Sequence, residues 1–174
     1  MLKGKRIYLR PVERDDLARY VKWLNDETVN AHLTTFIPMN LDDEVEWYEN
    51  QRHDSSTLNL AIVITTEEKH IGSVGLMKIQ PRNQSAELGI VIGDKECWGQ
   101  GYGQEAIERL VEFAFKQLNL NRIYLRVDAH HPAAKRCYEK SGFVEEGRLR
   151  SAGFRHGQFH DQFVMSILRS EYNN

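Results

Sequence analysis

The first half of the chain alternates between apolar and polar positions in a way that predicts a strand, two helices and an antiparallel meander. Residues 7–12 alternate and contain Pro11, which is typical of an edge strand. A helix capped by Asp15 follows, and Asn40 is the N-cap candidate of a second, acidic helix. Three β-branched and apolar runs separated by polar turns then predict the strands of the meander. These runs are residues 58–64, 71–79 and 86–92.

The second half contains the most periodic segment, a helix that opens at the glycine pair around Tyr102. One broad apolar stripe marks its buried face. The stripe consists of Ile107, Leu110, Val111, Ala114, Phe115 and Leu118. Because strand 123–127 follows, this strand, helix, strand order predicts a parallel crossover. A helix over 133–141 and a closing hairpin of 144–154 and 159–168 complete the prediction. We therefore predict one domain over 1–174, an α+β fold with a mixed, mostly antiparallel seven-stranded twisted sheet and four helices.

Composition narrows the function classes. Apolar residues make up 41% of the chain and charged residues 28%, with a formal net charge of -2. These values are ordinary for a globular protein and give no field that favours nucleic acid, and the apolar runs are too short to span a membrane. The start of the chain shows no signal peptide, so cytoplasm is the expectation. Two cysteines and scattered histidines lack metal-ligand spacing, so no metal site is expected.

One glycine-rich turn carries the clearest candidate chemistry. It reads Trp98, Gly99, Gln100, Gly101, Tyr102, Gly103 and Gln104. Turns of this kind bring backbone N–H groups close to an anion, and the dipole of the following helix favours negative charge, so the turn can hold a pyrophosphate. A glycine pair before a helix is a weak signal by itself. A P-loop is disfavoured because the Gly-Lys-Ser/Thr ending is absent, and a dinucleotide-binding fold because the turn follows an antiparallel meander.

The order of the elements and two motifs resemble the GNAT superfamily of acetyltransferases, over essentially the whole chain. The superfamily's cofactor motif, Gln/Arg-x-x-Gly-x-Gly/Ala after the fourth strand, is similar to residues 98–103. Its second motif, Asn-Pro-x-Ala followed by Tyr-Glu-Lys-x-Gly-Phe, is similar to residues 131–143. Residues 86–89, 98–103 and 145–161 look more narrowly like the branch that holds ribosomal-protein N-terminal acetyltransferases and spermidine acetyltransferases.

This resemblance implies an N-acetyltransferase with acetyl-CoA as co-substrate. Tyr138 is implied as the general acid that protonates the departing thiolate, with packing as its alternative role, and Glu87 as the base that acts directly or through water, with a structural hydrogen bond as the alternative. Trp98 replaces the family's Gln or Arg and is expected to pack beneath the turn, and His131 replaces an Asn beside the pantetheine. The implied cofactor-binding residues are Ile90, Val91, Ile92, Trp98, Gly99, Gln100, Gly101, Tyr102, Gly103, Gln104 and His131.

The acceptor is expected to be a primary amine, either a protein N-terminus or a small polyamine-like amine, that enters between the first two helices and the final hairpin. An acidic cluster in the first helices could attract a cation, although a charged helix face is usually only solvated. The cluster consists of Asp26, Glu27, Asp42, Asp43, Glu44, Glu46 and Glu49. The alternative function is a non-catalytic acetyl-CoA-binding sensor or interaction module, motivated by the replacements at Trp98 and His131. The chain is expected to be a monomer or a homodimer.

Overall fold

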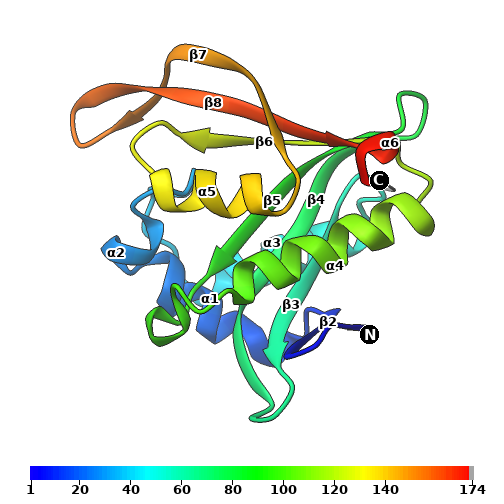
Figure 1. Ribbon diagram of the computed structural model, residues 1–174. Coiled ribbons are helices and arrows are strands. Elements are labelled where there is room, and N and C mark those ends of the chain that lie inside the picture. The colour runs from blue at the N-terminus through cyan, green and yellow to red at the C-terminus, as the bar shows by residue number, and fades with distance from the viewer. Residues whose placement is uncertain (173–174) are drawn as a thin grey trace.

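The computed structural model describes residues 1–172 and shows one twisted sheet with helices on both faces (Figure 1). The strand order is β1-β2-β3-β4-β5-β6-β8-β7. Neighbouring strands are antiparallel except β5 and β6, which are parallel and are joined through a helix, as the sequence predicts. The strands are β1 (Leu2–Lys3), β2 (Ile7–Pro11), β3 (Leu58–Ile64), β4 (Lys69–Gln80), β5 (Ser85–Ile92), β6 (Arg122–Asp128), β7 (Val144–Arg155) and β8 (Gln158–Leu168).

The helices cover both faces of the sheet. In Figure 1, α4 lies in front of the central strands and α1 and α3 lie behind them. The stripe of α4 packs on β5 through Ala86 and Leu88, while Val91, on the opposite face of the same strand, packs against the α1 cluster. No helix within residues 1–172 is long and apolar enough to cross a membrane. The helices are α1 (Leu17–Leu24), α2 (Glu27–Asn30), α3 (Leu41–His53), α4 (Tyr102–Lys116), α5 (Pro132–Lys140) and α6 (Arg169–Tyr172).

The predicted fold class is confirmed, but the predicted counts of seven strands and four helices are wrong. The part of the chain that the structure describes contains eight strands and six helices. The elements that the sequence missed are β1, which has two residues, and α2 and α6, which have four each. Elements this short span less than two periods of any hydrophobic pattern, so they leave no periodic signal. Pairing of Leu2 with Leu9 also places β2 inside the sheet rather than at its edge.

The start of α1 is organised by Asp16, and not by Asp15 as the sequence predicted. Asp16 is 2% exposed and accepts hydrogen bonds from Arg10 at 2.6 and 2.8 Å and from the Glu13 N–H at 2.8 Å. The Nδ1 atom of His70 lies 3.0 Å from the same carboxylate. Burial opposes ionisation, but these hydrogen bonds outweigh it and hold the pKa of Asp16 well below its usual range.

We expect Asp16→Asn to destabilise the fold by about 3–5 kcal/mol at neutral pH, because it leaves the Arg10 guanidinium without its partner. Since the folded-state pKa is lowered, the stabilisation by Asp16 is present above the unfolded pKa of about 3.9 and is lost as the pH falls towards the folded value. Urea unfolding should therefore show a wild-type advantage that shrinks from pH 7 to pH 3. The exposed neighbour provides the control: Asp15→Asn should change little at either pH.

The second helix begins where the sequence predicts. The Asn40 side chain accepts hydrogen bonds from the Asp42 and Asp43 N–H groups, which confirms Asn40 as the N-cap of α3. Most of the acidic side chains of α3 face solvent, but Glu44 is only 4% exposed. Its burial raises the pKa of the Glu44 carboxyl to about 7.

Candidate active site

The turn between β5 and α4 has the backbone that the glycine pattern predicts. Gly99 and Gly101 adopt positive φ angles of 71° and 85°, a conformation that L side chains rarely take. Gly101 is the N-cap of α4, and no side chain caps the helix. The first backbone N–H groups of α4 therefore remain available to an anion at the positive end of the helix dipole.

Arg6, on the loop before β2, contacts this turn and the start of α4. Its guanidinium donates to the Gln100 carbonyl at 2.9 Å and to the Glu105 carboxylate at 3.1 Å, and it lies over the Tyr102 ring. Glu105 in turn accepts hydrogen bonds from the Lys5 and Arg6 N–H groups at 2.6 and 2.7 Å. Sequence reasoning missed this arrangement because its two halves are far apart in the chain.

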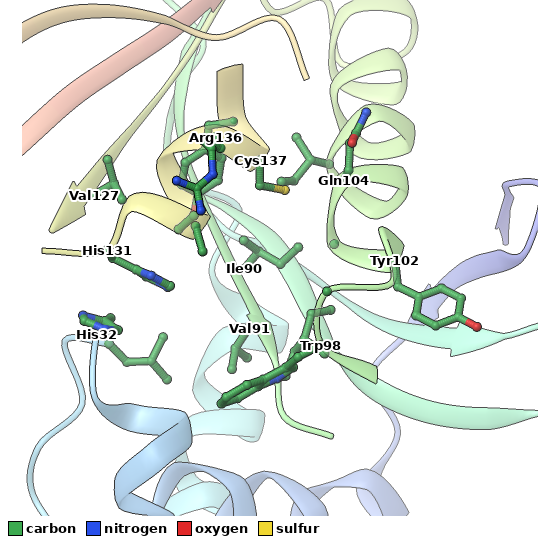
Figure 2. Close-up of a pocket in the computed structure, with 18 of the residues that line it drawn as sticks. His32, Ile90, Val91, Trp98, Tyr102, Gln104, Val127, His131, Arg136 and Cys137 are labelled. Atoms are coloured by element: carbon green, nitrogen blue, oxygen red, sulfur yellow. The ribbon is translucent and has the colours of Figure 1, made fainter. Parts of the chain in front are cut away.

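A cavity of about 660 Å³ opens beside the turn, where two parallel strands separate. β5 pairs with β6 only from Ser85 to Glu87, and beyond that point the strands diverge. The turn, β5, β6 and α5 form the walls (Figure 2). The cavity brings together these predicted site residues: Ile90, Val91, Ile92, Trp98, Gly99, Gly101, Tyr102, Gly103, Gln104, His131 and Tyr138.

Two predicted residues do not line this cavity. The Gln100 side chain donates to the Glu96 carbonyl at 2.6 Å, away from the opening. The Glu87 carboxylate lies 2.6 Å from Nζ of Lys78 and 3.9 Å from Nε of Arg126, and its side chain is 12% exposed. Glu87 therefore occupies the point where the strands begin to separate, held between two cations.

Trp98 does not pack beneath the turn as the sequence predicted. Its side chain remains 42% exposed, and its indole N–H donates to the Ile92 carbonyl at 2.7 Å. The indole thus ties the turn to the end of β5 and forms part of the cavity wall (Figure 2). Tyr102 contributes to the same wall, but its ring points away from the cavity towards Arg6.

Tyr138 is 9% exposed and extends from α5 to the cavity wall. Burial raises the pKa of its phenol, so the group keeps its proton at neutral pH. Within residues 1–172 the hydroxyl makes no hydrogen bond, so its donor is unused.

Basic side chains that sequence reasoning did not single out also line the cavity. They are Arg126 on β6 and Arg136 and Lys140 on α5. Arg136 and Lys140 are four residues apart on one helix, which places them on the same face, and this spacing is the signal that could have identified them. Together with the N-terminus of α4, these cations suit a ligand that carries several phosphates.

The site has the shape and charge for a long anionic ligand. A protein-family model shows to which family the chain belongs. The model is described as an acetyltransferase (GNAT) domain and matches residues 6–144. The chain belongs to the GNAT acetyltransferase family. The resemblance inferred from the two motifs is therefore confirmed.

Individual relatives agree with this family. The chain is 35% identical to a spermidine N(1)-acetyltransferase of Vibrio cholerae serotype O1, over 98% of each chain. It is 26% identical to YdaF of Bacillus subtilis, provisionally named a ribosomal N-acetyltransferase, over 94% of this chain and 90% of that protein. Among solved structures, the Vibrio cholerae spermidine N-acetyltransferase in complex with CoA and spermine matches with a TM-score of 0.91 and 32% identity, covering 97% of this chain and 99% of the other.

The chain is thus an N-acetyltransferase of the GNAT family that uses acetyl-CoA as co-substrate. The site fits this co-substrate because the cavity combines a glycine turn at the N-terminus of α4, three cations and an apolar wall from β5. Within the described residues, no group of three histidine, cysteine, aspartate or glutamate side chains is arranged to hold a metal ion.

Proposed function

We propose that this GNAT enzyme transfers the acetyl group of acetyl-CoA to a primary amine, which attacks the thioester directly. The observation that carries the proposal is the cavity between β5 and β6, which has the glycine turn at one side and Tyr138 among its lining residues. A neutral amine, a polarised carbonyl and a proton for the thiolate are what amide formation from a thioester needs.

In this proposal the turn and β5 hold the co-substrate. The pyrophosphate binds the N–H groups between Gly99 and Gln104, and Arg136 and Lys140 supply further positive charge. Because β5 has no partner strand beyond Glu87 on the side of β6, the backbone of Ile90–Ile92 is available to pair with the pantetheine arm. An N–H group aimed at the thioester carbonyl contributes roughly 2.7–4 kcal/mol to the rate in acyl-transfer enzymes.

Tyr138 acts as the general acid in this proposal, since it lines the cavity and burial raises the pKa of its phenol. The base role of Glu87 stays a prediction. Its carboxylate lies on the strand that would carry the thioester, which supports the role, but Lys78 and Arg126 compete for its oxygens.

The acceptor amine reaches the thioester through a second cavity of about 170 Å³. This second cavity shares Leu33, Ile90 and Val91 with the main cavity, so the two meet beside the end of β5. None of the described residues that line it carries a charge. The other lining residues are Thr34, Thr35, Asn59, Ser73, Gly75, Met77 and Gly89. The acidic cluster of the first helices therefore does not form this entrance.

Two acceptor classes remain, and different observations favour them. The similarity to spermidine acetyltransferases favours a polyamine. The uncharged second cavity favours an amine attached to a small neutral group, such as a protein N-terminus, because the further ammonium groups of a polyamine would meet no carboxylate there. The proposed acceptor is therefore an amine on a small neutral group, since the uncharged cavity is a property of this chain itself.

A panel of amines with acetyl-CoA tests the function through release of free thiol. We expect saturable turnover with a primary amine, and a higher kcat/KM for a peptide with an uncharged first residue than for spermidine. The same peptide with its N-terminus already acetylated is the matched control and should not react. Binding of acetyl-CoA without turnover on any class of amine would contradict the proposal and favour the non-catalytic module instead.

A further inference from the structure

Two histidines from distant parts of the chain stack at the edge of the main cavity. His32 lies in the segment between α2 and α3, and His131 is the N-cap of α5. Their ring centroids are 4.1 Å apart and their planes differ by 17°. Figure 2 shows the two rings facing one another at one side of the cavity. Both residues line this cavity.

The imidazole nitrogens of the pair are free to meet a ligand. Within residues 1–172, neither ring makes a side-chain hydrogen bond, although each has one nitrogen that can accept and one that can donate when neutral. His32 directly precedes Leu33 and Thr34, which line the second cavity. His32 is therefore the chain neighbour of Leu33, which lines both the proposed entrance and the co-substrate cavity.

The surroundings of the pair favour the neutral form of both rings, because they lower the pKa of each. Loss of water around each ring lowers the pKa of His32 and of His131, and the charge of Arg155 lowers both further. Asp128 on β6 opposes this, but its carboxylate already lies 3.5 Å from Nε of Arg155 and accepts the His130 N–H at 2.8 Å. Two more histidines have a smaller lowering effect on His32, namely His130 and His156. Because the rings are stacked, a proton on one ring disfavours a proton on the other.

We propose that His32 takes the proton of the acceptor ammonium, and that His131 is the positioning residue that orients it by stacking. This inference rests on the proposed function, the acetylation of a primary amine by direct attack. Within residues 1–172 the His32 imidazole forms no ion pair, whereas the Glu87 carboxylate is paired with Lys78 and Arg126.

In the proposed reaction the ammonium nitrogen loses two protons, and the thioester bond is replaced by an amide bond. An ammonium N–H bond breaks, its proton passes to His32, and the freed electron pair forms the bond between nitrogen and the thioester carbon. The carbon–sulfur bond breaks, and the thiolate takes the phenol proton of Tyr138. The nitrogen's second proton restores the phenol through water, His32 releases its proton to solvent, and one proton is produced for each amide.

The experiment compares the pH dependence of kcat at saturating acetyl-CoA, with the best amine of the panel as acceptor. We expect His32→Gln to lower kcat about 100-fold at pH 7 with little change in the KM for acetyl-CoA. The loss should shrink as the pH approaches the pKa of the amine, because the neutral amine then needs no base. Added imidazole should restore part of the rate. His131→Asn should keep acetyl-CoA binding and move the acid limb of the profile to higher pH, because His32 regains water.

His53→Gln, at the exposed end of α3, is the matched control and should behave like the wild type. A loss in His32→Gln that is equal at every pH and is not relieved by imidazole would overturn the inference. It would also be overturned if Glu87→Gln, and not His32→Gln, produced the pH-dependent loss. If the wild type itself acetylates no amine, the proposed function fails instead, so the two failures are distinct.

Discussion

Replacing Tyr138 with Phe should lower kcat by about two to four orders of magnitude, the range for a lost general acid, while acetyl-CoA binds almost as before. The phenylalanine ring keeps the packing of α5 on Phe143, so only the hydroxyl is removed. Without it, the thiolate must leave without its proton or take one from water. Because burial raises the pKa of the phenol, the wild-type group keeps its proton across the neutral range.

Single-turnover kinetics with excess enzyme measure this step separately from product release. Tyr124→Phe is the matched control, because Tyr124 is half-buried on β6 and does not line the cavity. The hydroxyl of Tyr138 has no partner within residues 1–172, so the variant should unfold at nearly the wild-type denaturant concentration. Turnover equal to that of the wild type would remove Tyr138 from the mechanism.

Local sequence could predict the elements that have a long hydrophobic pattern or residues with a special backbone preference. The stripe from Ile107 to Phe115 places α4 correctly, whereas Leu118 was wrongly included, because it lies beyond the end of the helix and is exposed. The β-branched run places β3 correctly and matches its bounds at both ends. The glycines at 99 and 101 predicted the turn because few other residues adopt its backbone. Tyr138 was found through the motif around it, and its place on the cavity wall agrees with that motif.

The remaining features depend on contacts between distant segments. Nothing near Arg6 signals that its guanidinium fixes a turn at Gln100, and nothing near His32 signals a stacking partner at His131. The same limit applies to Glu87. The alternation of side chains along the strand allowed Glu87 to lie beside the thioester. The cations that surround its carboxylate come from β4 and β6, and only the register of the sheet brings them together.

The proposed role of the turn in co-substrate binding can be tested with Gly101→Val. Gly101 has a φ of 85°, and a Cβ there would lie 3.2 Å from a guanidinium nitrogen of Arg6, so a β-branched side chain must distort the turn. N–H groups displaced from the pyrophosphate lose hydrogen bonds worth about 1.5–3 kcal/mol in total. Calorimetry should therefore show acetyl-CoA affinity reduced roughly 10- to 100-fold.

The strain itself also destabilises the fold, and the hairpin provides a control with the same strain. Gly157, in the turn between β7 and β8, has a φ of 76° and open space around its missing side chain. Gly157→Val should lose a comparable amount of stability and keep the wild-type affinity for acetyl-CoA. Because both variants place the same side chain in a left-handed conformation, a difference in affinity between them reports the turn at Gly101 alone. Equal affinities would mean that the pyrophosphate binds elsewhere in the cavity.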